Sequence, residues 1–222
     1  MISFFKKYKL FVIVMSCLSA IIMIAFYFAL RDAKVLPVYQ PENFNVELVD
    51  PSIQHVRKYH TIKDFKLVNQ NGETITQEDY KDKIYVADFF FTTCQTICPV
   101  MTKNMAVIQK EILNDDEVML LSHTVTPEID TVAQLKRYAI EKGVNDKKWN
   151  LVTGDKKQIY DLARKSYLAV KSTGDDNYGM VHTENFILID KEKRVRGTYD
   201  GTNEEEIKEL LEDIKILKAS YK

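Results

Sequence analysis

The 222-residue sequence has no excess of charge of either sign, no internal repeat and no low-complexity tract. Its 31 basic and 32 acidic residues leave a formal net charge of −1, so the charge gives no general reason to expect a nucleic-acid partner. With 45% hydrophobic residues, the chain can bury one good core. Length and composition therefore predict one folded domain, and a long apolar run predicts an anchor in addition.

Cysteine and proline are scarce, with three and five residues respectively. Cys17 lies inside the apolar run near the N-terminus, so the rest of the chain keeps only Cys94 and Cys98. These two cysteines lie four residues apart in the sequence, between an apolar segment and a helical pattern. They are the first candidates for chemistry.

The apolar run, residues 10–30, contains no charged side chain. At ~1.5 Å per residue, a helix of this length would cross a hydrocarbon layer of about 30 Å. Three lysines precede the run within residues 1–9, whereas two basic residues follow closely within residues 31–34. The positive-inside tendency therefore predicts a single-pass anchor with a cytoplasmic N-terminus and a domain on the extracytoplasmic (periplasmic) side, an oxidising compartment.

Two alternatives compete with a spanning helix. A cleaved signal peptide usually has an apolar region of about 7–15 residues that ends at small residues, whereas this run is longer and lacks an A-x-A site. The segment Val14-Met15-Ser16-Cys17 loosely resembles a bacterial lipobox, which would make Cys17 a lipidated N-terminus. The apolar run continues for thirteen residues past Cys17, and this length favours the spanning helix.

Residues 31–58 are of mixed polarity, contain three prolines and show no sustained periodicity, which is typical of a linker. His55 and His60, at its end, are expected to be solvated surface residues. The folded domain is predicted to comprise residues 59–222.

The pattern of that domain predicts alternating strands and helices. Asn71-Gly72 lies between short alternating segments and predicts a β-hairpin, and the nearly continuous apolar segment 84–91 predicts a central strand buried on both faces. The other predicted elements are, in order, a helix at about 98–114, a strand at 118–125, a helix at 131–142, a short strand at 149–153, a helix at 156–168 capped by Asp155, a strand pair at 186–190 and 194–199, and a final helix from Asn203 with Glu206 placed for a capping box.

A parallel strand–helix–strand unit with a right-handed crossover, followed by an antiparallel hairpin and a closing helix, is the thioredoxin arrangement. The sequence therefore predicts an α/β, thioredoxin-like fold with an extra N-terminal β-hairpin and an inserted helix. One transmembrane helix precedes it.

The spacing of Cys94 and Cys98 suggests that both lie on the first turn of a helix, near its partially positive N-terminus. This environment lowers the pKa of a thiol and favours the thiolate. A thiolate pair can exchange disulfides, and it also suits a soft ion such as Cu(I). A structural disulfide is less favoured, because so short a loop constrains the unfolded chain little. The motif alone does not decide between redox chemistry and metal binding.

No proline precedes the predicted strand at Phe186, where thioredoxin-like reductases keep a cis-proline that faces their cysteines. His182 stands there instead. In this fold the loop that enters the strand lies against the cysteine-bearing end of the helix. An imidazole in that loop could complete a site of two cysteines and one histidine.

Four segments, in order, resemble the SCO/SenC family of membrane-anchored copper-binding proteins, which assist assembly of the CuA centre of cytochrome c oxidase. FFFTTCQTICP resembles the family's FxFTxCxxxCP, LLSHTVTPEIDT its S-x-x-x-D-P-E-x-D-T, WNLVTG its W-x-x-L-T-G, and VHTENFILID its histidine before a strand ending in Asp. The resemblance covers roughly residues 60–220. It implies that Cys94, Cys98 and His182 are the copper ligands.

The sequence departs from the family pattern at one position. The family often has Asp before Pro-Glu, whereas Thr126 precedes Pro127 here, so this chain lacks a carboxylate at that position. Glu128 and Asp130 remain as nearby acids. The neighbouring His123 lies on a predicted buried strand and is expected to be a hydrogen-bonded core residue rather than a ligand.

Asp88 lies six residues before Cys94, the offset at which thioredoxins place a buried acid that assists thiol proton transfer. We expect either a raised pKa and a role in redox cycling, or a neutral carboxyl bonded to the backbone. Met101 and Met105 are expected to pack in the core. Met180, beside the proposed histidine ligand, is an open candidate for a thioether contact during copper transfer.

The resemblance implies a copper chaperone that carries Cu(I), with Cu(II) as a second oxidation state, to a copper-receiving subunit of cytochrome c oxidase. The alternative is a thiol-disulfide oxidoreductase that reduces cysteines of that subunit or of another exported protein and is itself served by a thiol reductant. Both readings use Cys94 and Cys98, and only the metal site needs His182. Peroxidase activity is a weaker third reading, because no peroxidatic Thr-x-x-Cys context follows a proline.

Overall fold

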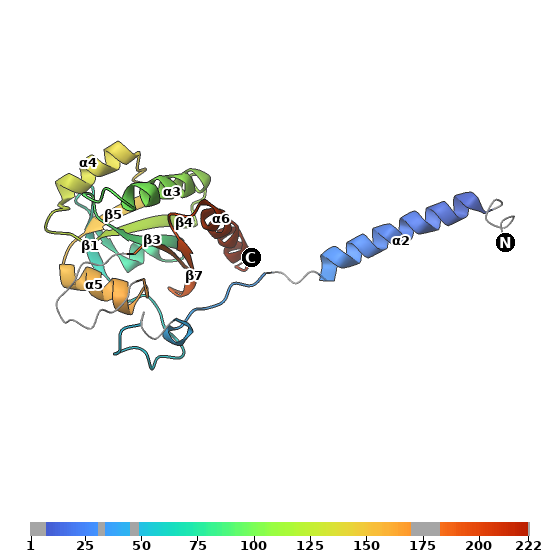
Figure 1. The fold of residues 1–222 in the computed structure, drawn as a ribbon, viewed down its shortest axis with the longest axis horizontal. Helices are drawn as coiled ribbons and strands as arrows, with labels where there is room; N and C mark the ends of the chain where they lie inside the picture. The colour runs from blue at the N-terminus through green and yellow to red at the C-terminus, as the bar shows by residue number, and fades with distance from the viewer. Residues whose placement is uncertain (1–7, 31–33, 45–48, 170–182, 222) are drawn as a thin grey trace. The chain divides into compact units, whose positions relative to one another are not determined.

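The structure is a computed structural model that describes residues 8–30, 34–44, 49–169 and 183–221 (Figure 1). The chain divides into two compact units, residues 1–35 and residues 36–222. In the first unit, helix α2 (Lys9–Leu30) is a single helix of 22 residues. Its segment Lys9–Phe26 has a mean hydropathy of 2.4, so it is long and apolar enough to cross a membrane.

The second unit is an α/β domain built on one mixed sheet with the strand order β2-β1-β5-β4-β3-β6-β7. Its strands are β1 (Lys66–Asn69), β2 (Thr74–Thr76), β3 (Ile84–Phe90), β4 (Val118–Thr124), β5 (Trp149–Thr153), β6 (Asn185–Ile189) and β7 (Val195–Asp200). Strands β3, β4 and β5 are parallel, and β6, β7 and the β1–β2 hairpin are antiparallel to their neighbours. The helices are α3 (Cys98–Glu111), α4 (Val132–Lys142), α5 (Lys156–Lys165) and α6 (Glu204–Ala219), with 3-10 turns η1 (Pro41–Asn43) and η3 (Gln77–Tyr80).

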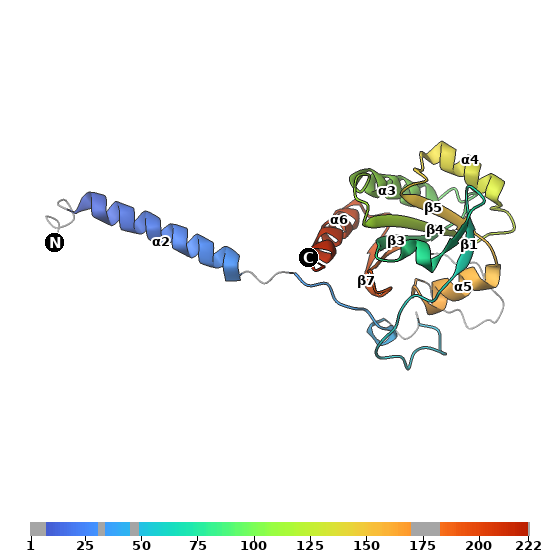
Figure 2. The same cartoon turned by 180° about the vertical axis from the view of Figure 1, so that it is seen from behind.

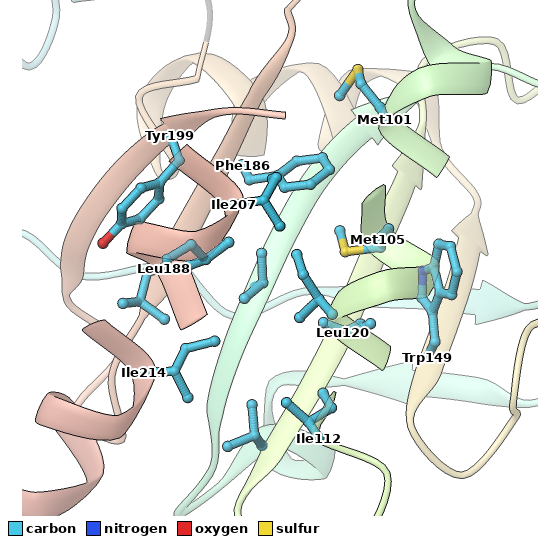
Figure 3. Close-up of a cluster of buried hydrophobic side chains, with 14 of the residues drawn as sticks. Met101, Met105, Ile112, Leu120, Trp149, Phe186, Leu188, Tyr199, Ile207 and Ile214 are labelled. Atoms are coloured by element: carbon cyan, nitrogen blue, oxygen red, sulfur yellow. The ribbon is translucent and has the colours of Figure 1, made fainter. Parts of the chain in front are cut away.

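Strand β3 is buried along its whole length because helices cover both faces of the sheet. Alternate residues point to opposite faces, as the two-residue period of a strand requires. Helices α3, α4 and α6 cover one face, where Met101 and Met105 pack with Leu120 and Trp149 (Figure 3). Helix α5 covers the other face (Figure 1, Figure 2). The thioredoxin-like arrangement and the core positions of both methionines are thus confirmed.

The predicted elements are all present, and the differences concern their ends. Helix α3 stops at Glu111 rather than near 114, where Asn and Asp residues favour a turn. Helix α5 stops at Lys165 rather than 168, and Leu168 has a positive φ of 54°, which a right-handed helix cannot contain. The β1–β2 turn has the positive φ expected of it, 78° at Gly72.

The two predicted helix caps have different outcomes. The side chain of Asp155 caps α5 by accepting a hydrogen bond from the Gln158 backbone N–H at 2.7 Å. The capping box predicted for α6 is wrong. The Asn203 side chain does accept from the helix backbone, but the Glu206 carboxylate accepts instead from the Asp200 N–H at 2.6 Å. The turn after β7 brings that N–H within reach of Glu206.

Part of the segment that was expected to be a linker packs on the domain. Leu36 and Val49 are only 4% and 1% exposed. The Arg196 guanidinium donates hydrogen bonds to the carbonyls of Leu36 (2.6 Å) and Pro37 (2.8 Å), and the Tyr39 N–H donates to Val195 O of β7 at 2.9 Å. These contacts cover the edge strand β7. The segment shows no hydrophobic periodicity because its backbone groups, rather than one face of a helix or strand, bond to β7.

His60 is buried, so the prediction that it is a solvated residue is wrong, whereas His55 is exposed as predicted. The His60 backbone N–H donates to the Gln40 side-chain oxygen at 2.9 Å, and its ring Nε2–H donates to the Ser166 carbonyl at 2.7 Å. Burial lowers the pKa of His60, because desolvation disfavours the charged imidazolium. Both bonds join residues that are distant in sequence, which explains why the local pattern did not indicate them.

We expect a fragment that begins at residue 59 to be markedly less stable than one that begins at Lys34. The shorter fragment lacks the buried side chains of Leu36 and Val49, whose burial is worth roughly 3–6 kcal/mol together, and it leaves the Arg196 guanidinium without two carbonyl acceptors. Urea unfolding of both fragments measures the difference. Equal midpoints and equal slopes would show that residues 34–58 contribute nothing to the folded unit.

Candidate metal centre

The two cysteines lie at the C-terminal end of strand β3, where the chain turns into helix α3. Cys98 is the first residue of α3, and Cys94 lies in the preceding loop, so the prediction that both share the first helical turn is wrong for Cys94. The Cys94 N–H bonds to the Phe91 carbonyl at 3.3 Å in a turn that the chain needs in order to leave the strand. Even so, Cys94 Sγ accepts a hydrogen bond from the Cys98 N–H at 3.5 Å.

The sulfur of Cys94 therefore occupies the place of a helix cap. Helix α3 has no side-chain cap at Ile97, and the backbone N–H groups of a first helical turn lack partners within the helix. A negatively charged sulfur is favoured there by both the hydrogen bond and the helix dipole. Both cysteines are free thiols, with Cys94 partly exposed and Cys98 only 3% exposed.

The two thiols differ strongly in acidity. Partial burial of Cys94 tends to raise its pKa, but hydrogen bonds from the backbone and side chains of Cys98 and Thr96 together lower it to about 7. Burial raises the pKa of Cys98 to about 12, and the neighbouring Cys94 and Asp88 add to the rise. Near neutral pH, Cys94 is thus the available thiolate, and Cys98 must lose its proton when a metal binds.

Asp88 lies in β3 on the sheet face covered by α3. Its carboxylate accepts a hydrogen bond from the Ser122 hydroxyl, which in turn accepts one from Trp149 Nε1–H at 2.8 Å. Burial raises the pKa of Asp88 to about 7, although the Ser122 bond and one from its own backbone act in the opposite direction. This direction agrees with the expected rise in pKa, and a role of this carboxyl in redox cycling stays a prediction.

His123 is a core residue, as expected. It is 0% exposed and lies on the opposite sheet face, stacked on Phe89 with ring centroids 4.8 Å apart and in edge contact with Tyr167 at 5.2 Å. Burial lowers the pKa of His123 to about 3, so the ring is neutral. Its Nδ1–H donates to the Asp88 carbonyl at 3.4 Å, while Nε2 has no hydrogen-bond partner among the described residues.

We expect His123→Phe to leave copper binding unchanged and to raise the free energy of unfolding by about 1 kcal/mol, because the change removes a buried nitrogen that has no partner. Urea unfolding and Cu(I) titration measure the two effects. His60→Phe is the matched control and should destabilise the domain, because it leaves the Ser166 carbonyl unpaired. Loss of copper binding in His123→Phe would show that this histidine belongs to the metal site.

The two acids that follow Thr126 have different environments. Glu128 is exposed and forms an ion pair with Lys156 at 3.1 Å. Asp130 is fully buried, and its carboxylate accepts hydrogen bonds from the hydroxyls of Thr92, Thr124 and Thr126. The Thr126 hydroxyl thus donates to Asp130, where the resemblance had suggested a carboxylate in place of Thr126. The sequence pattern indicated Asp130 as a nearby acid but not these partners, of which Thr92 lies within the cysteine motif.

The remaining candidates, His182 and Met180, lie outside the described residues. Within the described ranges, no group of three or more His, Cys, Asp or Glu side chains could hold a metal ion. The described part of the site therefore consists of two sulfurs at the N-terminus of α3. Any third ligand to a metal held there would come from outside the described residues.

The parallel β3–α3–β4 unit, with a dithiol where the central strand enters its helix, defines a thioredoxin-like domain with a pair of redox-capable, soft ligands. The SCO1/SenC family model matches residues 53–218, which is most of the chain. The SCO1 protein homolog of Bacillus subtilis strain 168 is 31% identical over 160 residues, covering 70% of this chain and 82% of that relative. The chain belongs to the SCO1/SenC family.

Two solved structures of the family are similar to this chain. One is BsSco, a cytochrome c oxidase assembly protein in which a disulfide switch was identified, with a TM-score of 0.61, 31% identity, and coverage of 71% of this chain and 93% of that one. The other is Bradyrhizobium japonicum ScoI with copper bound, with a TM-score of 0.55, 26% identity, and coverage of 69% and 99%. Copper and thiol redox chemistry thus both occur on this fold in relatives.

Proposed function

We propose that the protein is a membrane-anchored copper chaperone that holds copper through Cys94, Cys98 and His182 and assists maturation of the CuA centre of cytochrome c oxidase. The observation that carries this proposal is the placement of Cys94 Sγ on the Cys98 N–H, with both cysteines as free thiols. Copper-bound ScoI from Bradyrhizobium japonicum supports copper as the metal. Soft thiolate ligands favour Cu(I) over harder ions.

The two sulfurs would take up copper in unequal ways. Cys94, with a pKa of about 7, offers a thiolate near neutral pH, whereas Cys98 releases its proton when the metal arrives. His182 would supply a neutral imidazole as the third ligand. A disulfide between the cysteines removes both thiolates, so oxidation would prevent copper binding and reduction would restore it.

Helix α2 would anchor this domain as a single span, with residues 1–9 in the cytoplasm and the domain on the periplasmic side. That compartment is oxidising, so the chaperone would need a thiol reductant to keep the two cysteines reduced. The copper recipient would be a subunit of the oxidase exposed on the same side of the membrane.

A second function, thiol-disulfide exchange, is favoured by the unequal exposure of the two cysteines. The Cys94 thiolate would attack a partner disulfide and form a mixed disulfide with one of its sulfurs. The Cys98 thiolate would then attack the Cys94 sulfur and release the reduced partner. The partner would gain two electrons and two protons, and this chain would be left with a Cys94–Cys98 disulfide. The disulfide switch identified in BsSco supports the oxidised form of such a pair.

Complementation of cells that lack the gene separates the two functions. We expect CuA content and oxidase activity of the membranes to fall without the protein, to return with the wild-type chain, and to stay low with Cys98→Ser or His182→Ala. Full rescue by His182→Ala together with failure of Cys98→Ser would favour the reductase. Normal CuA content without the protein would contradict both functions at this centre.

A further inference from the structure

A buried cluster joins the loop that carries Cys94 to the segment between β4 and α4. It consists of Asp130, Thr92, Thr124 and Thr126, and we call it the Asp130 cluster. Asp130 is 0% exposed, and its Oδ2 accepts from the Thr126 hydroxyl at 3.0 Å, from the Thr124 hydroxyl and from the Thr92 backbone N–H at 3.2 Å. Its Oδ1 accepts from the Thr92 hydroxyl. One carboxylate thus receives four hydrogen bonds.

Two of these four bonds come from Thr92, two residues before Cys94. The same hydroxyl of Thr92 also accepts a hydrogen bond from the Gln134 side-chain amide of α4 at 3.0 Å. Thr92 is therefore tied to both Asp130 and α4. It is the second residue of the turn closed by the Cys94 N–H and the Phe91 carbonyl.

The loop needs such a tie because regular structure does not hold it. Strand β3 ends at Phe90 and α3 begins at Cys98, so Cys94 lies in neither element. Its sulfur makes contacts at 3.5 Å with the Cys98 N–H and at 3.6 Å with the Thr96 hydroxyl, which are ordinary lengths for a sulfur acceptor. Because sulfur is a weak hydrogen-bond acceptor, the position of the loop also depends on the stronger bonds that Thr92 makes nearby.

We propose that Asp130 is a positioning residue for the dithiol, and that by holding Thr92 it keeps the Cys94 sulfur at the N-terminus of α3, beside Cys98. Asp130 touches neither sulfur and acts only through Thr92. The expected effect on Cu(I) binding rests on the proposed function, whereas the role of Asp130 in placing Cys94 does not. Thr126 is the third hydroxyl that donates a hydrogen bond to Asp130. An aspartate at position 126 would instead place a second buried carboxylate beside Asp130.

The test compares substitutions in the reduced full-length protein in detergent, in a Cys17→Ser background so that only two thiols remain. Two readouts are used: Cu(I) affinity by competition with a chromophoric chelator, and the rate at which iodoacetamide modifies Cys94 at pH 7. We expect Asp130→Ala to weaken Cu(I) binding by about tenfold or more, as loss of an outer-shell partner does at other metal sites. The Cys94 modification rate should fall by about fivefold, because the thiolate loses its place at the helix N-terminus.

Conservative and matched variants separate positioning from general loss of structure. Asp130→Asn can keep its amide oxygen at the Oδ2 position, so we expect it to stay within about threefold of wild type on both readouts. Thr92→Val removes only the hydroxyl tie of the loop and should reproduce part of the Asp130→Ala effect. Thr124→Val removes a hydroxyl bond to the same carboxylate from β4 and should leave Cys94 unchanged.

Asp213→Ala is the control for loss of a buried carboxyl elsewhere, since Asp213 is buried and accepts a hydrogen bond from the Tyr199 hydroxyl at 2.9 Å. It should lower stability without changing the Cu(I) affinity or the modification rate of Cys94.

Wild-type modification rates of Cys94 in Asp130→Ala and Thr92→Val would overturn the proposal. An Asp130→Asn variant that behaves as Asp130→Ala would overturn it as well. If Asp130→Ala does not fold, Thr92→Val against Thr124→Val decides. If the wild type fails to bind Cu(I), the proposed function fails, and the modification rates still decide the role of Asp130.

Discussion

In the reduced, metal-free protein, iodoacetamide should modify Cys94 about a thousandfold faster than Cys98 at pH 7. The pKa of about 7 leaves roughly half of Cys94 as thiolate, while the pKa of about 12 leaves almost none of Cys98. The more basic thiolate of Cys98 is intrinsically more nucleophilic, which offsets about two of the roughly five orders of magnitude in thiolate fraction. The burial of Cys98 widens the remaining difference.

The pH dependence of this reaction follows from the same lowered pKa. Because the thiolate is the reacting form, the Cys94 rate should rise with pH, reach half its maximum near pH 7 and level off above it. Peptide mapping by mass spectrometry assigns each product to its cysteine, and Cys94→Ser is the control that isolates the slow reaction of Cys98. Equal rates for the two thiols, or a Cys94 rate that rises only above pH 8.5, would contradict the site geometry.

Asp88→Asn should stabilise the metal-free domain at alkaline pH and change it less in acid. The folded-state pKa of Asp88 is raised from 3.8 to about 7, so the folded state holds the proton over a range in which the unfolded state releases it. The contribution of Asp88 to stability is therefore fully present below about pH 4 and is lost as the pH rises through 7. Asparagine does not titrate and avoids this loss.

The size of the effect follows from the shift of about three pKa units, each worth about 1.4 kcal/mol. We expect the stability of Asp88→Asn relative to wild type to increase by ~2–4 kcal/mol between pH 4 and pH 8, with the lower figure allowing for water entry around a buried carboxylate. Urea unfolding across this range measures it, with Asp213→Asn as a control at another buried carboxyl. A stability difference that does not change with pH would mean that Asp88 titrates normally.

The same substitution tests the redox hypothesis. Asp88 adds to the raised pKa of Cys98, so Asp88→Asn should make the Cys98 thiol more acidic. A thiolate titration that is unchanged in the variant would leave Asp88 as a structural residue of the Ser122 and Trp149 network.

Sequence patterns predicted the parts of the fold that depend on local periodicity. The buried run of β3, the helical spacing of Met101 and Met105 and the turn at Gly72 each follow from a few neighbouring residues, and each is present. The cysteine motif and three further segments in order identified the family, which the comparisons confirm. The local pattern of residues and the order of the motifs were sufficient to predict these features.

Several features that the sequence did not predict depend on contacts between distant residues. His60 is buried by the Ser166 carbonyl, 106 residues away in the sequence, and the segment at Leu36 is held by Arg196, 160 residues away. Cys94 lies outside the helix because the chain must turn after β3, which spacing alone does not show. The network around Asp130 joins the ends of two parallel strands, so it exists only once the sheet has formed.

Anaerobic titration of the reduced domain, from Lys34 onward, with Cu(I) against a chromophoric chelator tests the central claim most directly. The account predicts tight binding of one copper per chain, and a loss of affinity of about a hundredfold or more in both Cys98→Ser and His182→Ala, because each removes a ligand. Weak binding by the wild type, or a His182→Ala variant that binds as tightly as wild type, would contradict the copper site. Cys94 and Cys98 would then be better explained as a dithiol reductant.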